Sequence, residues 1–241
     1  MRKLVAVVSC HAREGYSNVI RSTWLPLFPK DQADILFFRG RGATREPLED
    51  EVFLDCDDTY EGLPEKVQSI VRWAYEHSYD YVLKLDDDVV VKPRELLASG
   101  FEKWDFVGGL ETACKPNEIQ TPWGFAYWLS RKCMKLVIDT PLPGQPGSTH
   151  THWHGNDEAW VSTILHINGI FLHNDHRYWL HRGDRVPPKR SLRAPKRDYP
   201  LSKQPPVDVF AICVYLNWGG FHMTPTEEIL REIKMLFERY K

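Results

Sequence analysis

The sequence predicts an α/β fold, in which a mixed, mostly parallel sheet is flanked by helices in a single domain. Short runs rich in branched apolar residues alternate with segments whose apolar residues recur at helical spacing. Polar clusters follow two of the strand-like runs directly, at positions 11–15 and 86–88. Because ligands bind beyond the carboxyl ends of the strands in such sheets, both clusters are candidate site segments.

The first half of the chain alternates strands with helices. A strand at 4–9, a polar loop at 11–15, a short helix at 18–24 and strands at 35–38 and 52–54 are expected in this order. Pro64 stands at the favoured first position of a helix. The apolar residues of this helix recur at helical spacing and are Val67, Ile70, Val71 and Ala74. The next strand, at 79–85, leads into three consecutive aspartates.

The second half continues the alternation. Expected here are helices at 94–99, 131–138 and 159–166, strands at 106–107, 125–129, 170–172 and 209–216, and a Pro/Gly/Ser-rich loop at 141–151. The segment from Arg177 to Lys203 is basic and proline-rich without clear periodicity, and is expected to be a long loop or arm. Thr224 and Pro225 cap a final helix. Its apolar face comprises Ile229, Leu230, Ile233, Leu236 and Phe237.

The composition sets limits on the class of protein. The formal net charge of −2 indicates no particular partner, and no apolar run approaches the roughly 20 residues of a membrane helix. Five cysteines without Cys-x-x-Cys spacing argue against a disulfide framework or structural zinc. An unpaired cysteine set of this kind favours a reducing compartment.

Asp86, Asp87 and Asp88 stand between two apolar runs that read as buried strand. Three adjacent carboxylates are electrostatically costly unless a cation or hydrogen-bond donors compensate them. Hard divalent cations take oxygen ligands, and the alternation of side chains along a strand directs Asp86 and Asp88 to the same side. The cluster therefore predicts a metal site formed by Asp86 and Asp88, the alternative being a solvated acidic turn.

Four segments in sequence order resemble the β-1,3-galactosyltransferase and Fringe family of glycosyltransferases. They are Ile20-Arg21-Ser22-Thr23-Trp24; the stretch 55–66, with the spacing Asp-x-x-Asp-x-Tyr-x-x-Leu-x-x-Lys; Lys84-Leu85-Asp86-Asp87-Asp88-Val89; and 124–130 followed by 157–160. The resemblance extends from about position 4 to about position 169. Each motif alone is weak, but four in this order are specific.

This resemblance implies a GT-A fold, a Rossmann-like variant of the predicted sheet. It also implies a nucleotide-sugar donor, usually a UDP-sugar, a Mn²⁺ (or Mg²⁺) ion, and transfer with inversion to a hydroxyl acceptor such as a glycan. The expected division is a catalytic core at 1–176, with its donor-binding part at about 1–110 and its acceptor part at about 111–176. Positions 177–241 are expected to complete the same domain.

By resemblance, Asp88 is the expected direct metal ligand, and Asp86 faces the donor ribose or assists the metal. The family often supplies a histidine as a further ligand, and a neutral imidazole beside carboxylates suits manganese. The candidates are His173, His176 and His181, of which His181 is the best match by its distance from Glu158.

The donor pocket is expected at the loop after the first strand and at two of the motifs. Its expected residues are Ser9, His11, Arg13, Arg21, Asp58, Lys66, Asp86 and Asp87, although Asp87 could be structural. Lys66 could reach a phosphate as a point charge. Alternatively, Arg21 and Asp58 pair across the fold. Ser17 stands where the family usually has an arginine, and Arg13 is a candidate substitute.

An inverting transfer needs one base that takes the acceptor hydroxyl proton, and Asp157 and Glu158 are the candidates. Relative to the family, the order of the two acid types is swapped, so either Glu158 is the base or a local shift makes it Asp157. The alternative reading is an acidic pair stabilised by the helix dipole. The acceptor cleft is expected at Trp123, Gly124, Trp153 and His154.

Two other functions fit the same sequence. The basic segment from Arg177 to Lys203 could follow a phosphate backbone, as in a virus-encoded transferase that glycosylates modified bases in DNA. It could equally be a solvated loop that closes over the donor diphosphate. A non-catalytic glycan or sugar-nucleotide binding module is the alternative of another class. Met1 directly before the first strand favours a cytoplasmic protein of a bacterium or of a virus-infected cell.

Overall fold

A computed structural model describes residues 1–110, 119–148, 156–182 and 211–215, together with positions 231, 234, 235, 237 and 238. The elements of the first half are β1 (Lys3–Val8), the 3₁₀ turn η1 (His11–Arg13), α1 (Glu14–Ser22), η2 (Leu25–Leu27), β2 (Asp34–Arg39), β3 (Glu51–Phe53), α2 (Leu63–Glu76) and β4 (Tyr81–Asp86). Those of the second half are β5 (Val89–Val91), α3 (Pro93–Leu97), η3 (Phe101–Lys103), β6 (Phe106–Leu110), β7 (Pro122–Ser130), α4 (Arg131–Asp139), α5 (Asp157–Ile167), β8 (His173–Asn174), β9 (Tyr178–Arg182) and β10 (Ala211–Tyr215).

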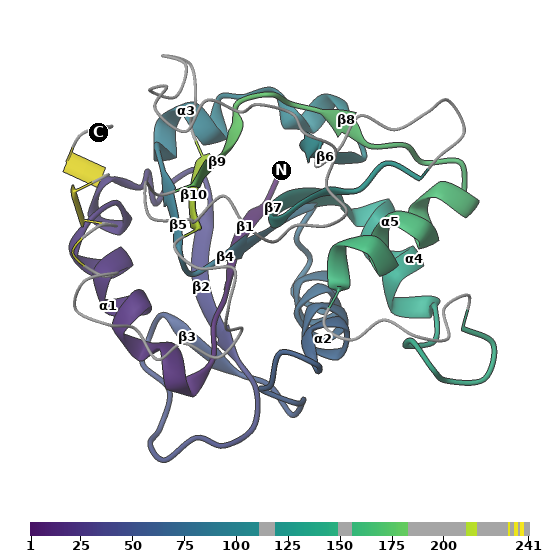
Figure 1. Ribbon diagram of the computed structural model, residues 1–241, viewed down its shortest axis with the longest axis horizontal. Helices are drawn as coiled ribbons and strands as arrows, with labels where there is room; N and C mark the ends of the chain where they lie inside the picture. Colours follow the sequence, from purple (N-terminus) through teal and green to yellow (C-terminus); the bar gives the residue numbers. More distant parts are fainter. Residues whose placement is uncertain are drawn as a thin grey trace, which may run out of the picture.

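The main sheet has seven strands in the order β3-β2-β1-β4-β7-β6-β8. Strands β3, β2, β1 and β4 run parallel, β7 is antiparallel to both β4 and β6, and β8 is parallel to β6. Helices cover both faces of this sheet (Figure 1). The mixed, mostly parallel sheet flanked by helices that the sequence predicts is therefore confirmed.

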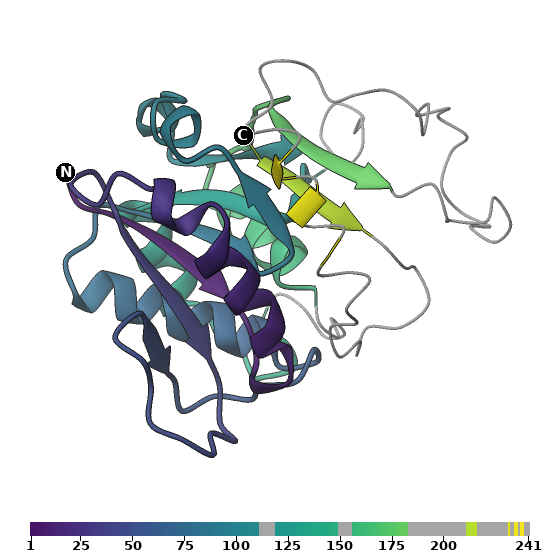
Figure 2. The same cartoon turned by 90° about the vertical axis from the view of Figure 1, so that its left-hand side faces the viewer.

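A second, three-stranded sheet has the order β5-β10-β9. β10 is antiparallel to β5 and parallel to β9, and Figure 2 shows β10 and β9 beyond one end of the main sheet. The chain leaves the main sheet at Asp86 and enters the small sheet at Val89. The aspartate cluster therefore lies at the junction between the two sheets.

The alternation of side chains along the strands produces two cores. On β1, Val5 and Val7 pack with α1, whereas Leu4, Ala6 and Val8 pack with α2, α4 and α5. Figure 1 shows α1 on one side of the sheet and these three helices on the other. Because β1 is apolar on both faces, it has no solvent-facing side, as expected for a central parallel strand.

Helix α2 follows its sequence closely. Pro64 lies in its first turn, and all four predicted apolar residues, Val67, Ile70, Val71 and Ala74, are buried. Burial of a valine or isoleucine side chain contributes about 1.5–3 kcal/mol. Packing of this face against the sheet and against α4 and α5 therefore stabilises the helix far more than its intrinsic propensity does.

Three segment predictions are wrong. Positions 11–15 are not an open loop but the 3₁₀ turn η1 leading into α1, which begins at Glu14 and ends at Ser22. Positions 170–172 are not a strand, although Ile170 and Leu172 are buried: they fill the core without a pairing partner, and sheet pairing begins at His173. Within the expected basic loop, Tyr178–Arg182 form strand β9, because β10 offers them a parallel partner.

The C-terminal helix is described at a few positions only. Phe237, predicted on its apolar face, is buried in the core with α1; Thr224 and Pro225 lie outside the described residues. In the described part of the chain, no helix has both the length and the apolar character needed to cross a membrane. The cysteines with described side chains, Cys10, Cys56 and Cys133, are free thiols.

Candidate active site

The aspartate cluster lies at the carboxyl end of β4, next to the end of β1. Val8 pairs with Asp86 in the parallel ladder, so the loop that follows β1 runs beside the cluster. Asp87 is buried, whereas Asp86 and Asp88 are partly exposed. This arrangement directs Asp86 and Asp88 toward one open region and Asp87 into the protein.

Asp87 is held by the loop after β1. Its carboxylate accepts hydrogen bonds from Ser9 Oγ at 2.7 Å and from Arg13 Nε at 2.9 Å and Nη2 at 2.5 Å. The same Arg13 Nη2 lies 3.3 Å from Asp88 Oδ2, and the guanidinium lies over the ring of Tyr16. Asp87 thus fixes the loop with Ser9 and Arg13, and Arg13 also pairs with Asp88.

Asp88 lies in a region with a surplus of negative charge. Burial raises its pKa to about 6; Arg13 opposes this shift, and the carboxylates of Asp86 and Asp87 add to it. A hard divalent cation would relieve that surplus, and carboxylate oxygens are suitable ligands, so Asp86 and Asp88 fit the expected metal. Within the described residues, however, no three His, Cys, Asp or Glu side chains converge into a complete cation cage.

Strand register separates the three histidine candidates. His181 pairs with Val214, one step beyond the pair formed by Cys213 and Val89, so its backbone lies at the Asp88 end of the small sheet. His173 lies on the edge strand β8, where its ring stacks on Trp104 with centroids 4.0 Å apart. His176 is exposed. The backbone of His181 therefore lies near the end of β4 that carries the aspartates, whereas His173 lies three strands away from β4.

On the donor side, Asp58 organises the backbone. It accepts hydrogen bonds from the backbone N–H of His11 at 2.9 Å and of Gly40 at 2.5 Å, and pairs with Lys66 Nζ at 2.7 Å. Lys66 Nζ also donates to the carbonyl of Ser9 at 3.0 Å, and the side chain is only 2% exposed. Lys66 is thus already engaged in fixing the loop between β1 and α1.

Gly40 is required by the same arrangement. A Cβ atom at this position would lie 2.7 Å from the Cys56 carbonyl oxygen and 2.9 Å from the Asp58 nitrogen. Only glycine lets the end of β2 approach this backbone so closely. The ring of His11 also contacts this backbone: its Nε2 lies 2.9 Å from the Gly40 carbonyl oxygen, and the ring makes a T-shaped contact with Phe53.

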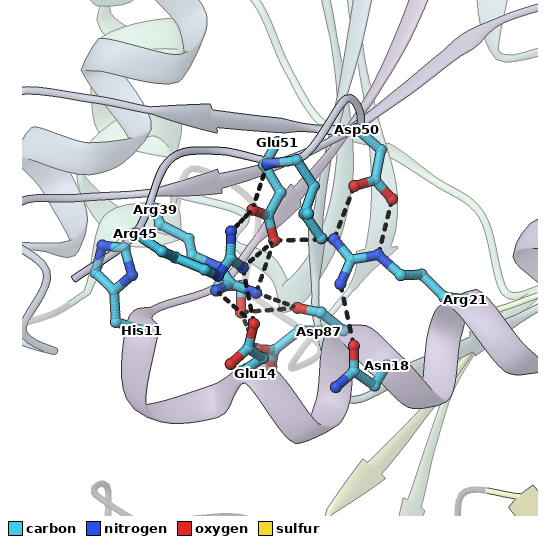
Figure 3. Close-up of polar contacts among 12 residues, drawn as sticks. His11, Glu14, Asn18, Arg21, Arg39, Arg45, Asp50, Glu51 and Asp87 are labelled. Atoms are coloured by element: carbon cyan, nitrogen blue, oxygen red, sulfur yellow. Dashed lines mark hydrogen bonds and ion pairs between the residues drawn. The ribbon is translucent and has the colours of Figure 1, made fainter. Parts of the chain in front are cut away.

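Arg21 does not pair with Asp58, so that alternative is wrong. It belongs to a cluster around the buried carboxylate of Glu51, which we call the Glu51 cluster and which Figure 3 shows. Its members are Glu14, Arg21, Arg39, Arg45, Asp50 and Glu51. Glu51 lies 2.9 Å from Arg21, 3.2 Å from Arg39 and 2.7 Å from Arg45. Burial opposes ionisation of Glu51, but its hydrogen bonds, chiefly that from Arg45, outweigh burial and lower its pKa to about 2.

A chain of polar contacts joins the Glu51 cluster to the aspartates. Arg39 Nη2 donates to Ser17 Oγ at 3.1 Å, and Ser17 Oγ lies 3.4 Å from Ser9 Oγ, which donates to Asp87. Ser17 is fully buried, and Arg39 is 1% exposed. The position at which the family usually has an arginine is therefore occupied here by a serine that accepts from an internal arginine.

The two residues predicted as candidate general bases, Asp157 and Glu158, stand at the start of helix α5. Asp157 is 2% exposed and accepts a hydrogen bond from the hydroxyl of Tyr127 at 2.7 Å. Burial raises the pKa of Asp157; Lys84 opposes this shift, and Asp86 adds to it. Asp157 is thus an enclosed carboxylate whose hydrogen-bonding capacity is engaged from within the protein.

Glu158 is partly exposed and lies on the backbone of Gly124. A Cβ atom on Gly124 would come within 3.0 Å of the Glu158 Cδ and Oε2 atoms, so the absence of a side chain makes room for the carboxylate. Burial and the neighbouring Asp157 raise the pKa of Glu158 to about 8, against the opposing effect of Lys84. Burial, followed by Glu158, likewise raises the pKa of Tyr60 to about 12, which places Tyr60 in the same region.

Lys84 joins the two halves of the site. It is 3% exposed, and its ammonium donates to Asp86 Oδ1 at 2.6 Å and to the Gly124 carbonyl at 2.5 Å, with Asp157 Oδ2 at 3.6 Å. Burial lowers the pKa of Lys84, but Asp157 and Asp86 outweigh burial and raise it. Its role was not predicted from the sequence. The available signal was a lysine inside an apolar strand two positions before Asp86, and hence on the same face.

The structure describes only some of the remaining predicted residues. Trp123 is partly buried and packs against the core, next to Gly109. Arg177 is engaged internally, with Asp175 at 2.6 Å and the Ser99 carbonyl at 2.9 Å. Trp153, His154 and the basic segment after Arg182 lie outside the described residues.

Comparisons with known proteins found one family model and a distant structural relative. Residues 17–103 match a family model described as galactosyltransferase. No curated protein matches the sequence. Among solved structures, a protein from Desulfovibrio desulfuricans G20 that carries the description putative nucleotide-diphospho-sugar transferase matches with a TM-score of 0.46 and 10% identity. The match covers 71% of this chain and 78% of the other. A similarity this distant is evidence neither for a shared activity nor for a shared substrate.

The family match contains three of the four motifs, ending after the aspartate cluster, and the fourth lies beyond it. It covers the residues around Asp58, Lys66 and Asp86, but not Gly124 or the acidic pair at the start of α5. Residues 17–103 thus match the galactosyltransferase family model, which confirms the resemblance recognised in the motifs for this segment.

Proposed function

We propose that this chain is a metal-dependent, inverting glycosyltransferase that moves a sugar from a UDP-sugar to a hydroxyl acceptor such as a glycan. One observation carries the proposal. A single buried ammonium, that of Lys84, lies between the donor-side Asp86 at 2.6 Å and the base-side Asp157 at 3.6 Å. The segment that matches the galactosyltransferase family model, which contains Asp86, thus lies next to the acidic pair Asp157 and Glu158, which the match does not cover.

The donor half, at about 1–110, would bind the nucleotide sugar with the residues that surround the aspartate cluster: Ser9, His11, Arg13, Arg21, Asp58, Lys66, Asp86 and Asp87. The contacts of Arg21, Asp58 and Lys66 support an indirect role, which is to fix the loop and β2. Arg13 remains the candidate phosphate contact, because it is partly exposed beside Asp88.

Asp86, Asp88 and His181 would hold Mn²⁺ or Mg²⁺. Such an ion, when bound, stabilises the negative charge that develops on a departing nucleotide diphosphate. The raised pKa of Asp88 supports this assignment, since a group of carboxylates with too few cations favours binding of a divalent ion.

Glu158, rather than Asp157, would be the base. Asp157 is enclosed and accepts from Tyr127, whereas Glu158 is partly exposed at the open side of Gly124. In the transfer, the acceptor oxygen bonds to the anomeric carbon, and the bond from that carbon to the diphosphate oxygen breaks. The acceptor proton passes to the Glu158 carboxylate, and UDP leaves with the electron pair.

The acceptor part, at about 111–176, would use Trp123, Gly124, Trp153 and His154, and positions 177–241 would complete the domain. A cytoplasmic location stays a prediction. No contact in the described part of the chain favours the DNA-modifying alternative, since Arg177 binds Asp175. The binding-module alternative predicts no turnover and is decided by the same experiment.

The proposal is tested with a panel of nucleotide sugars, with and without Mn²⁺, first without acceptor and then with a panel of glycan acceptors. We expect slow Mn²⁺-dependent hydrolysis of one UDP-sugar, and an inverted anomeric product by NMR when an acceptor is found. Asp88→Ala should abolish Mn²⁺-dependent turnover. Binding of nucleotide sugar without any hydrolysis or transfer would identify a binding module.

Glu158→Gln and Asp157→Asn separate the two base candidates. Because a positioned general base contributes about 10²–10⁴-fold, Glu158→Gln should lower kcat by that factor and leave UDP binding by calorimetry intact. Lys135→Met, which removes an exposed ion pair with Asp139 on α4, is the matched control. Full transfer activity of Glu158→Gln would assign the base elsewhere.

A further inference from the structure

Lys84 is a buried lysine whose polar partners come from three elements. An ammonium in the interior is costly unless it is paired and its three N–H donors are near acceptors. Lys84 finds its partners at the end of β4 (Asp86), on β7 (the Gly124 carbonyl) and at the start of α5 (Asp157). These are the elements that border the proposed reaction site on its donor and base sides.

Lys66 provides an internal comparison. It is equally buried and binds one carboxylate, Asp58, and one carbonyl, that of Ser9. Both of these partners belong to the donor half of the site. Lys84 has the same two kinds of partner and, in addition, reaches Asp157, so its contacts cross from the donor half to the base half.

Two contact routes lead from Lys84 to Glu158. The first passes through Gly124: Lys84 holds the carbonyl of this residue at 2.5 Å, and the Glu158 carboxylate lies on the side where a Cβ atom would be. The second passes through Asp157, the sequence neighbour of Glu158, which Lys84 and Tyr127 hold from two sides. Loss of the ammonium would release both supports of the carboxylate at once.

We propose that Lys84 is a positioning residue of the transfer reaction, which acts through the Gly124 carbonyl and Asp157 to hold the Glu158 carboxylate where the acceptor hydroxyl arrives. This inference rests on the proposed function and deepens it. It assigns Lys84 no proton transfer: the ammonium stays charged and sets a geometry. Misplacement of a reacting group by about 1 Å lowers a rate by about 100-fold, which is the effect expected here.

The first test is the charge-balanced double variant Lys84→Met with Asp157→Asn, because Lys84→Met alone leaves Asp157 buried without a cation. We expect the double variant to recover the melting temperature that the single variant loses. Its kcat, measured at saturating UDP-sugar and Mn²⁺, should remain about 100-fold below that of the wild type. If Lys84 only stabilised the fold, recovery of stability would restore kcat, so a kcat within about threefold of wild type overturns the inference.

The second test, Gly124→Ala, leaves every charge in place. The added methyl group meets the flexible end of Glu158, so the chain should fold while the carboxylate moves. We expect kcat to fall by about 10-fold or more, unchanged UDP binding by calorimetry, and a displaced carboxylate in a crystal structure. An unchanged kcat contradicts the inference, and this variant decides the matter if the double variant does not fold.

Lys66→Met is the matched comparison, since it removes the other buried ammonium. It should raise the KM for the UDP-sugar and leave kcat nearly unchanged, the opposite of the effect on Lys84. Equal effects of Lys66→Met and Lys84→Met on kcat would reduce both residues to structural lysines. If the wild type neither binds UDP with Mn²⁺ nor turns over any donor, the proposed function fails and the inference with it. A normal wild type with unaffected Lys84 and Gly124 variants refutes the inference alone.

Discussion

Glu51 is buried and Glu158 is partly buried, and their pKa values shift in opposite directions. Burial disfavours the charged form of each. Three guanidiniums surround Glu51, and its pKa falls to about 2. Among the described residues, the ammonium of Lys84 pairs with Asp86 and Asp157, and burial together with Asp157 raises the pKa of Glu158 to about 8.

The difference separates a carboxylate whose charge is matched by cations from one whose charge is not. The Glu51 cluster has matched charges and ties α1 to β2, β3 and the loop before β3 (Figure 3). Among the described residues around Lys84, carboxylates outnumber cations, and groups with shifted pKa values concentrate at functional sites. Substrate and cation would supply the missing compensation there.

The largest expected effect is on the matched cluster. Glu51→Gln leaves three guanidiniums without their central charge, and breaking a buried ion pair costs about 3–5 kcal/mol. Because the folded pKa of Glu51 lies below the unfolded value, its stabilisation is complete above about pH 4.5 and is lost as the pH falls toward 2. Urea unfolding at pH 7 and pH 3 measures the cost of the substitution and its dependence on pH. Equal stability of variant and wild type at pH 7 would refute the matched-charge interpretation.

Glu158→Gln should change stability in the opposite direction, making the protein more stable. The folded pKa of Glu158 lies above the unfolded value, so folding favours the protonated acid, and stability falls as the pH rises from about 4.5 to 8. The neutral amide removes this loss, and the variant should be more stable than wild type by about 1–2 kcal/mol at pH 8 and indistinguishable at pH 4. A variant less stable than wild type at pH 8 would show that the Glu158 carboxylate is adequately compensated.

Addition of Mn²⁺ should raise the free energy of unfolding through the carboxylates around Asp88, and not through the Glu51 cluster. At a concentration of ten times Kd, a bound ion adds about 1.4 kcal/mol to the free energy of unfolding. We expect this gain in the wild type and in Arg45→Met, but not in Asp88→Ala, by thermal denaturation with and without Mn²⁺. A gain that survives in Asp88→Ala would place the ion elsewhere.

The smallest effect tests how much redundancy the Glu51 cluster contains. Arg45 is one-third exposed and bridges Glu14 and Glu51, so Arg45→Met should cost only about 1 kcal/mol. High salt should reduce the difference further, because the exposed contact with Glu14 is screened. A loss as large as that of Glu51→Gln would mean that one arginine, rather than three, determines the cluster.

Local patterns predicted most of the elements. The buried faces of β1, α2 and β4 follow directly from apolar periodicity, and Pro64 correctly marks the start of α2. The errors lie where burial in the core does not coincide with pairing in a sheet. Ile170 and Leu172 are buried without sheet bonds, whereas Tyr178–Arg182 gain a strand partner from residues far along the chain. Neither outcome can be read from a local window, because each depends on which neighbour is available.

For the site, the motifs located Asp86, Asp88, Asp157 and Glu158 but not the partners that distinguish them. Lys84 stands inside one of the four motifs, and its role became visible only when β7 and α5 brought Gly124 and Asp157 to it. The guanidinium of Arg21 binds Asp50 and Glu51, and not Asp58 as one alternative had it. A pairing between charges depends on distances that sequence spacing does not contain.

By itself, the order of residues determined the alternation of strands and helices, the acidic ends of β4 and α5, and the family of residues 17–103. These depend on side-chain periodicity and on short motifs, both of which are local. Only the tertiary structure decided which cation belongs to which carboxylate, and therefore why the pKa of Glu51 falls while that of Glu158 rises. The reason is that Coulomb energies and desolvation depend on distance and burial, which are set when segments far apart in the chain pack together.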